Sequence, residues 1–221
     1  MVHGPGRRYV SRGGEKLEAA LDDLAVPIEG ARALDAGAST GGFTDCLLRH
    51  GARQVTAVDV GYGQLHERLR ADDRVDVRDR TNVRDLRPGD LGEPFDVVVA
   101  DLSFISLRLV LSNLLALARP GAHVVLLVKP QFEAGRAAAV RGRGVVRDPD
   151  GWREALHRVC AAFVGEGAAI MGGMVSPIRG ADGNVEFLLH ALAPGTTARG
   201  VTNVDEVIDS LVARAARPDL G

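Results

Sequence analysis

The sequence contains two cysteines, two lysines and no hydrophobic run of the length that crosses a membrane. Cys46 and Cys160 each lie in a periodic apolar pattern, so we expect buried thiols in a reducing compartment. No stretch of about 18 apolar residues and no signal-peptide pattern occurs, which predicts a soluble, cytoplasmic protein. The six histidines are scattered and nothing has the spacing of metal ligands, so we expect no metal site.

Net charge is also small, because 27 basic and 29 acidic residues leave −2, which argues against indiscriminate binding of nucleic acid. Positive charge is nevertheless concentrated in two segments. The first contains Arg7, Arg8, Arg12 and Lys16, and the second contains Arg136, Arg141, Arg143 and Arg147. Clusters of this kind bind phosphate groups, so we predict a phosphate-binding surface, with ordinary solvated loops as the alternative.

The chain has 221 residues, of which 46% are hydrophobic, enough for the core of one domain. We expect a basic N-terminal extension at residues 1–15 and the folded domain at residues 16–221. Strand-like apolar runs occur at residues 31–34, 55–59, 75–78, 95–101, 123–128, 168–175 and 185–190. Helical spacing occurs at residues 16–24, 64–70, 107–117, 152–164 and 205–215.

Strands and helices alternate along most of the chain, but a loop alone joins the last two strands, which should therefore pair antiparallel. This order predicts an α/β fold. We expect a doubly wound, Rossmann-like sheet of seven mostly parallel strands with one antiparallel edge strand.

The turn between the first strand and the next helix is rich in glycine and other small residues. Such a turn at a helix N-terminus suits the polar part of a nucleotide-like cofactor, because a Cβ would block its approach. Gly37, Ser39 and Gly42 imitate a dinucleotide-binding fingerprint. Asp35, Gly37, Ser39 and Gly41 equally fit the loop of methyltransferases that use S-adenosylmethionine (SAM). Either cofactor, or a purely structural turn, is compatible with this pattern alone.

Ionisable residues follow several of the predicted strands, where ligands of open α/β sheets lie. Asp59 occupies the position at which a carboxylate typically accepts a hydrogen bond from a ribose hydroxyl. The alternative is that it caps the N-terminus of a helix. Asp101 and Lys129 end two adjacent buried strands, so we expect them to face each other, as a catalytic pair or as a structural salt bridge. Glu186 alternates with apolar residues and must meet a cation when buried; the candidates are the two lysines, Lys129 and Lys16.

Longer strings resemble the TlyA/haemolysin-type, FtsJ-like methyltransferases. These strings are RYVSRGGEKL (8–17), LDAGASTGGFT (34–44), DVGYGQL (59–65), RTN (80–82), ADLSFIS (100–106), VKPQFE (128–133) and GNVE (183–186). The resemblance implies a class I SAM methyltransferase fold and 2′-O-methylation of ribose in ribosomal RNA, with ribosomal RNA or a ribosomal subunit as the partner. It also implies a catalytic tetrad of Lys16, Asp101, Lys129 and Glu186.

With the glycine-rich turn and the strand ends, the resemblance gives the expected SAM-binding residues: Asp35, Gly37, Ala38, Ser39, Gly41, Gly42, Phe43, Asp59, Asn82 and Asp101. The two basic segments give the expected RNA-binding residues: Arg7, Arg8, Arg12, Arg136, Arg141 and Arg143. In this mechanism the ribose hydroxyl attacks the methyl carbon of the sulfonium. Lys129 is either the general base or the group that orients that hydroxyl, and we favour the second role.

Typical members of this family begin with a small S4 RNA-binding domain, whereas this chain is expected to begin in the linker that follows it. A SAM methyltransferase that acts on a small molecule is therefore the main alternative. Three further alternatives are a nicotinamide-dependent oxidoreductase, a membrane-lytic protein and an RNA-binding module without catalytic activity.

Overall fold

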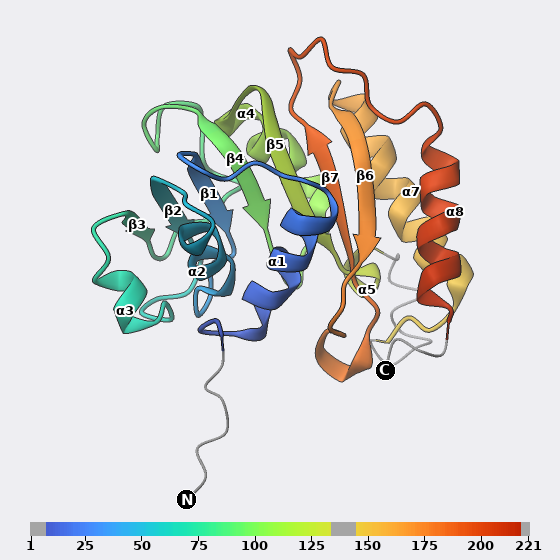
Figure 1. Ribbon diagram of the computed structural model, residues 1–221, viewed down its shortest axis with the longest axis horizontal. Helices are drawn as coiled ribbons and strands as arrows, with labels where there is room; N and C mark the ends of the chain where they lie inside the picture. The colour runs from blue at the N-terminus through green and yellow to red at the C-terminus, as the bar shows by residue number, and fades with distance from the viewer. Residues whose placement is uncertain (1–7, 134–144, 218–221) are drawn as a thin grey trace, which may run out of the picture.

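The computed structural model describes residues 8–133 and 145–217. These residues form one seven-stranded sheet with the strand order β3-β2-β1-β4-β5-β7-β6 (Figure 1). The strands are β1 (Arg32–Ala36), β2 (Gln54–Val58), β3 (Val75–Arg78), β4 (Phe95–Ala100), β5 (Ala118–Val128), β6 (Ala169–Val175) and β7 (Phe187–Leu192).

Strands β3, β2, β1, β4 and β5 run parallel, and β7 runs antiparallel to both β5 and β6. The predicted fold class, with its antiparallel pair at one edge, is therefore confirmed. The reversed strand β7 lies one place inside the edge strand β6 because the two form a hairpin whose second strand pairs with β5.

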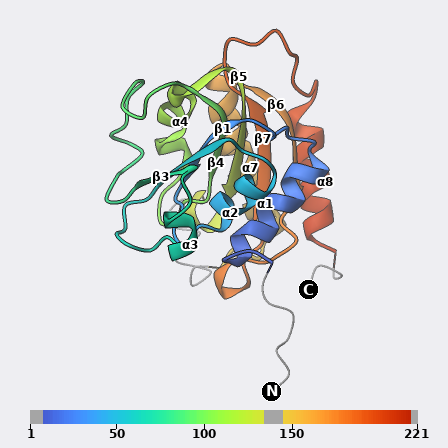
Figure 2. The same cartoon turned by 60° about the vertical axis from the view of Figure 1, so that its left-hand side comes forward.

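Helices cover both faces of the sheet (Figures 1 and 2). They are α1 (Arg12–Asp23), α2 (Gly42–Arg49), α3 (Glu67–Arg70), α4 (Leu111–Leu117), α5 (Pro130–Glu133), α7 (Pro149–Gly165) and α8 (Val204–Ala215), with short 3₁₀ turns at Leu107–Leu109 and Ala181–Gly183. Helices α1 and α2 pack in one hydrophobic core, and α4, α7 and α8 in the other. None of the described helices combines the length and apolar character that a membrane crossing requires.

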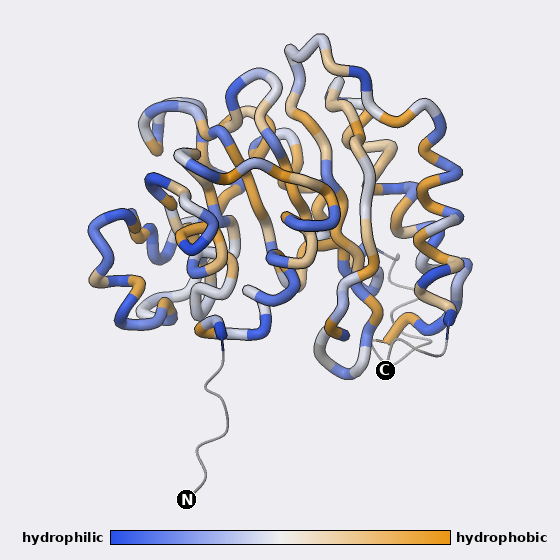
Figure 3. Tube along the Cα trace, in the orientation of Figure 1, coloured by the Kyte–Doolittle hydropathy of each residue, from blue (hydrophilic) through white to orange (hydrophobic). Residues whose placement is uncertain are grey.

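The central strands contribute to both cores. In β4, Val97 and Val99 belong to the core under α1 and α2, whereas Val98 and Ala100 belong to the opposite core. Burial on both faces explains the uninterrupted apolar run Val97–Ala100 in this strand. Figure 3 shows the same arrangement, with hydrophobic residues concentrated in the central strands and hydrophilic ones in the surrounding loops.

Several predicted boundaries differ from the structure. The helix expected at residues 64–70 is confined to Glu67–Arg70, and the one expected at residues 107–117 is divided into a 3₁₀ turn and α4. Strand β5 begins at Ala118, before Pro120, rather than at residue 123. A proline at the beginning of a strand removes one hydrogen-bond donor and leaves the later pairing intact. The Pro120-Gly121 pair therefore lies inside the strand instead of in a turn before it.

Helix α1 starts earlier than its pattern suggested, with both glycines of the Gly13-Gly14 pair inside its first turn. A Cβ on Gly14 would lie 2.3 Å from Cγ of the buried Tyr9, so close packing explains this glycine. The domain boundary predicted at residue 15 therefore falls within α1.

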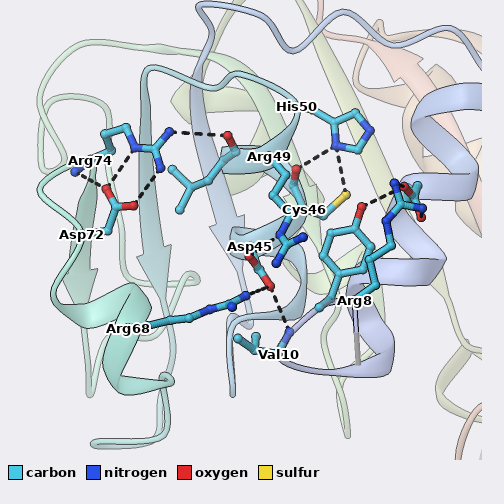
Figure 4. A network of polar contacts seen from close by, with 12 residues as sticks. Arg8, Val10, Asp45, Cys46, Arg49, His50, Arg68, Asp72 and Arg74 are labelled. Atoms are coloured by element: carbon cyan, nitrogen blue, oxygen red, sulfur yellow. Dashed lines mark hydrogen bonds and ion pairs between the residues drawn. The ribbon is translucent and has the colours of Figure 1, made fainter. Parts of the chain in front are cut away.

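A polar network fastens the N-terminal segment to α2 (Figure 4). The backbone N–H of Val10 donates to Asp45 at 2.9 Å, and the same carboxylate pairs with Arg49 at 3.0 Å and with Arg68. This arrangement fixes the beginning of α1 and, with it, the position of Lys16 on the next turn.

Candidate active site

A cleft lies at the carboxyl ends of β1, β4 and β5. It consists of two adjoining pockets of about 450 Å³ and about 270 Å³, which share Gly37, Ser39, Asp101 and Ser103 as walls. The larger pocket is lined mainly by apolar side chains, namely Val58, Val60, Val83, Leu102, Phe104, Ile105 and Val110. The smaller pocket is more polar and includes Lys16 and Lys129.

The glycine turn forms the floor between the two pockets. Gly37 has φ +85°, and a Cβ there would lie 2.7 Å from the backbone oxygen of Asp101. Both the backbone conformation and the contact with the end of β4 therefore require glycine. Ser39 also has a positive φ, +47°, and its backbone N–H donates to Asp59 at 2.8 Å. This hydrogen bond holds a conformation that costs on the order of 1–3 kcal/mol for a residue with a side chain.

Two residues expected to bind the nucleoside face the larger pocket. Asp59 and Asn82 both line it among the apolar side chains. The two carboxylate oxygens of Asp59 already accept the backbone N–H groups of Ser39 and Gly61, at 2.8 and 2.7 Å, and retain further lone pairs. Apolar walls with two convergent polar side chains suit a flat, partly polar group such as a nucleoside.

Not every residue of the predicted cofactor loop borders the cleft. Ala38, Gly42 and Phe43 line the smaller pocket, but Asp35 and Gly41 are absent from the described walls of both pockets. Gly41 instead faces the α3 region, where a Cβ would lie 2.3 Å from Leu69. These two residues therefore lie outside the walls of both pockets and support the turn, and their predicted contact with SAM stays a prediction.

Asp35 is completely buried beneath the turn, where one oxygen accepts a hydrogen bond from Thr44 Oγ1 at 2.6 Å. Its other oxygen has no hydrogen-bond partner within the described part of the chain. Burial raises the pKa of Asp35 to about 7, against the opposing effect of the Thr44 hydrogen bond, and the nearby Asp101 and Asp59 carboxylates raise it further.

Lys129 and Asp101 meet at the junction of the pockets. Lys129 Nζ lies 2.6 Å from Asp101 Oδ1 and donates a hydrogen bond to Ser103 Oγ at 2.8 Å. The predicted contact between the two strand ends is confirmed, because β4 and β5 are neighbours in the sheet.

Glu186 meets Lys16 rather than Lys129. Lys16 Nζ donates to Glu186 Oε2 at 2.5 Å, and both residues are buried. Glu186 lies one residue before β7, and Lys16 lies between it and the smaller pocket. Three of the four predicted catalytic residues thus line the cleft, and Glu186 supports it from behind Lys16. The desolvation penalty of a buried ion pair makes such a pair weak evidence for a stabilising role alone.

The predicted RNA-binding arginines are only partly described. Arg12 is exposed and lines the smaller pocket. Arg8 pairs with Glu18 at 2.6 Å, which offsets part of its charge. The remaining four, Arg7, Arg136, Arg141 and Arg143, lie outside the described residues.

Three residues of the site were not singled out from the sequence. Ser103 contacts Lys129, and the buried Glu133 accepts hydrogen bonds from Ser106 Oγ at 2.5 Å and Leu107 N at 2.7 Å. Phe104 is 92% exposed, has φ +64° and lies beside Phe132, with ring centroids 5.3 Å apart. The signal available beforehand was their position in two of the strings that resemble the family.

Solved structures show the same fold. A proposed hemolysin from Streptococcus thermophilus matches with a TM-score of 0.87 and 42% identity, covering 96% of this chain and 77% of that one. Methyltransferases of known structure, among them SAM-dependent enzymes and one from Bacillus cereus solved with SAH, match with TM-scores of 0.56–0.59 at 16–19% identity. At such low sequence identity, the similarity to these structures supports the fold alone.

Sequence relatives agree with the structural ones. A Bacillus subtilis protein named YqxC is 48% identical over 216 residues, 97% of this chain and 76% of its own length. The 16S/23S rRNA (cytidine-2′-O)-methyltransferase TlyA of Mycobacterium tuberculosis is 50% identical over 183 residues, 83% of this chain and 68% of its own length. The FtsJ-like methyltransferase family matches residues 9–192. The chain therefore belongs to the FtsJ-like methyltransferase family and is an enzyme of the methyltransferase class.

Proposed function

We propose that this enzyme transfers a methyl group from SAM to a ribose 2′-hydroxyl of ribosomal RNA. The observation that carries the proposal is the Lys129–Asp101 contact at the junction of the two pockets, where a donor and an acceptor would meet. The name of the Mycobacterium tuberculosis relative supports ribosomal RNA as the substrate class. No feature of the described residues favours a small-molecule substrate.

The residues of the larger pocket fit SAM. The glycine turn leaves space that a Cβ on Gly37 would fill, and Asp59 and Asn82 offer acceptors and an amide among apolar walls. We propose that Asp59 and Asn82 hold the nucleoside and that the turn at Gly37 and Ser39 holds the polar end. When bound, SAM supplies a methyl group activated by its sulfonium.

The protein's own contribution is chiefly alignment. Holding reacting groups in position contributes about 7–11 kcal/mol, whereas a general base contributes a factor of about 10²–10⁴. Lys129 lies where it would orient the ribose hydroxyl, with Asp101 holding the lysine in place. Lys16, fixed by Glu186, would place a second positive charge beside the ribose.

Phe104 suits the base of the target nucleotide. An aromatic ring that is 92% exposed at the edge of the larger pocket, on a strained backbone, is expected at a binding site rather than in a passive loop. Stacking of a base on an aromatic side chain contributes about 1–3 kcal/mol. We propose that the target base stacks on Phe104 while its ribose faces Lys129.

The test is methyl transfer from labelled SAM to ribosomal subunits, with mapping of the modified nucleotide. The Lys129→Ala variant should lose roughly a hundredfold or more of the turnover. Its affinity for SAM, measured by calorimetry with NAD as the negative control, should stay within about twofold because Lys129 is absent from the larger pocket. Near-normal turnover by the variant would refute the role of Lys129, and a wild type that methylates only small hydroxylated compounds would refute the substrate.

A further inference from the structure

Lys129 has two close partners that differ in chemistry. Asp101 Oδ1 forms an ion pair with its Nζ at 2.6 Å. Ser103 Oγ accepts a hydrogen bond from the same Nζ at 2.8 Å. The ion pair holds the amine at the end of β4, and the hydroxyl gives it a second fixed direction.

The other lysine of the site is held differently. Lys16 donates its hydrogen bond directly to the Glu186 carboxylate. A carboxylate only accepts hydrogen bonds, so it is a partner for an ammonium group. Lys129 has a carboxylate partner as well, Asp101, and in addition a hydroxyl partner, Ser103. The contact with Ser103 is therefore what distinguishes Lys129 from Lys16.

Ser103 lies in an exposed loop that is anchored at its far end. The far end of this loop is anchored by Glu133, whose two oxygens accept from Ser106 and from the Leu107 backbone. Glu133 is 2% exposed and belongs to α5, which begins directly after Lys129. The loop that carries the hydroxyl and the strand end that carries the amine are therefore fixed to the same short helix.

We infer that Ser103 is a positioning residue for methyl transfer, because its hydroxyl sets the direction in which the Lys129 amine faces the ribose. Ser103 lines both pockets, so the directed group lies where they join. This inference rests on the proposed function, since it requires a hydroxyl substrate opposite Lys129.

The first test compares Ser103→Ala and Ser103→Thr in the full chain with ribosomal subunits. The alanine variant should lower kcat about tenfold or more, because alignment of the reacting groups is lost, while KM for SAM stays within about twofold. Threonine keeps the hydroxyl and should restore most of kcat. Equal losses in both variants would overturn the inference.

Ser106→Ala is the matched control, since it removes a hydroxyl from the same loop that contacts Glu133 instead of Lys129. It should lower the melting temperature more than kcat. If both alanine variants lost kcat and thermal stability in parallel, loop anchoring would explain the effect and the inference would fail.

A double-mutant cycle tests the dependence on Lys129. In a Lys129→Ala background, Ser103→Ala should cause no further loss of kcat, because residues that act through one contact are not additive. A further tenfold loss would contradict the inference.

A readout without activity separates this inference from the proposed function. The chain has two lysines, so labelling lysine with ¹³C at Cε gives two signals, assigned by Lys16→Arg and Lys129→Arg. Ser103→Ala should shift the Lys129 signal and leave that of Lys16 unchanged. An inactive wild type with this shift would refute rRNA methylation alone, whereas an active wild type without the shift would refute the role of Ser103 alone.

Discussion

Among single residues, Lys16 and Glu186 form the contact with the largest expected effect on stability, a buried ion pair. Both side chains are almost completely withdrawn from water, and they are 2.5 Å apart. A Cβ on Gly180 would lie 2.1 Å from Glu186 Oε1, so the surrounding chain encloses the carboxylate closely.

Replacement of Glu186 by alanine is therefore expected to destabilise the fold by about 3–5 kcal/mol, because Lys16 would keep an uncompensated buried charge. The free energy of unfolding in urea measures this effect. Asp209→Asn, which breaks the exposed Arg153–Asp209 pair at 3.0 Å, is the control and should cost under about 1 kcal/mol. A Glu186→Ala variant as stable as this control would show that the buried pair contributes no more to stability than an exposed one.

The ionisable members of the site could be predicted at this scale because they stand at strand ends or interrupt apolar alternation. Asp101, Lys129 and Glu186 share that signal. Ser103 and Glu133 do not, since their roles arise from hydrogen bonds to residues 26 or 27 positions away in the chain. A serine or a glutamate in a loop gives no sequence signal of a partner that only the folded chain brings close.

At the scale of elements, the antiparallel pairing of β5 and β7 contains an unusual contact between two histidines. His123 Nδ1 lies 2.9 Å from His190 Nε2, and the rings are stacked with centroids 5.1 Å apart. Burial, and then the nearby His123, lower the pKa of His190 to about 4. The folded state therefore holds this ring neutral at a pH at which an unfolded chain would protonate it.

This contact should make the fold sensitive to acid. The unfolded state binds a proton on His190 near pH 6.5 and the folded state only near pH 4, so stability falls as the pH is lowered through this window. The loss should reach about 3 kcal/mol by pH 4. Urea titrations of wild type and His190→Gln at several pH values measure it, and the variant should lose less stability over the window.

The difference between variant and wild type is the informative quantity, because Asp35 acts in the opposite direction. Its raised pKa makes the folded state bind the extra proton, so its contribution to stability decreases as the pH rises towards about 7. His157→Gln on the surface of α7 is the matched control. If it flattened the pH profile as much as His190→Gln, the buried pair would not be the cause.

The strands were predicted to within a few residues, the four-residue β3 among them, except at the beginning of β5. Burial on both faces gives β4 a pattern that only a central strand has. The first residues of β5 include Arg119, Pro120 and Gly121, a turn-like sequence that lies in an irregularity between the pairs Phe95–Ala118 and Val97–His123. Strand β7 pairs with β5 only from His123, so regular pairing begins where the sequence predicts the strand.

At the scale of the whole molecule, the charge facing the cleft matters more than the net charge of −2. Arg12 lies at the smaller pocket, whereas Arg8 is committed to Glu18 and also lies over the Tyr9 ring. The two arginines are close in the sequence but should therefore contribute unequally to RNA binding.

Arg12→Ala should weaken RNA binding and lower the slope of log K against log salt concentration by about 0.7–0.9, the effect of one lost phosphate contact. Joint replacement of Arg136, Arg141 and Arg143 should lower it further, and SAM affinity should be unchanged in both. Filter binding at several salt concentrations measures the slopes.

Two control variants test this surface. Arg8→Ala should change the salt slope less than Arg12→Ala does. Arg53→Ala, at the opposite ends of the strands, should leave the salt slope unchanged. Equal slopes for all variants would exclude this phosphate-binding surface.

The partition that separates the two pockets has one more consequence. Gly37 and Asp101 touch each other through backbone packing, and each forms part of both compartments. Occupants of the two pockets would therefore contact the same wall, and thermodynamic linkage makes any coupling between their affinities mutual and equal in size. Cofactor and nucleic acid should accordingly bind with interdependent affinities, so a dissociation constant for either describes this enzyme only at a stated concentration of the other.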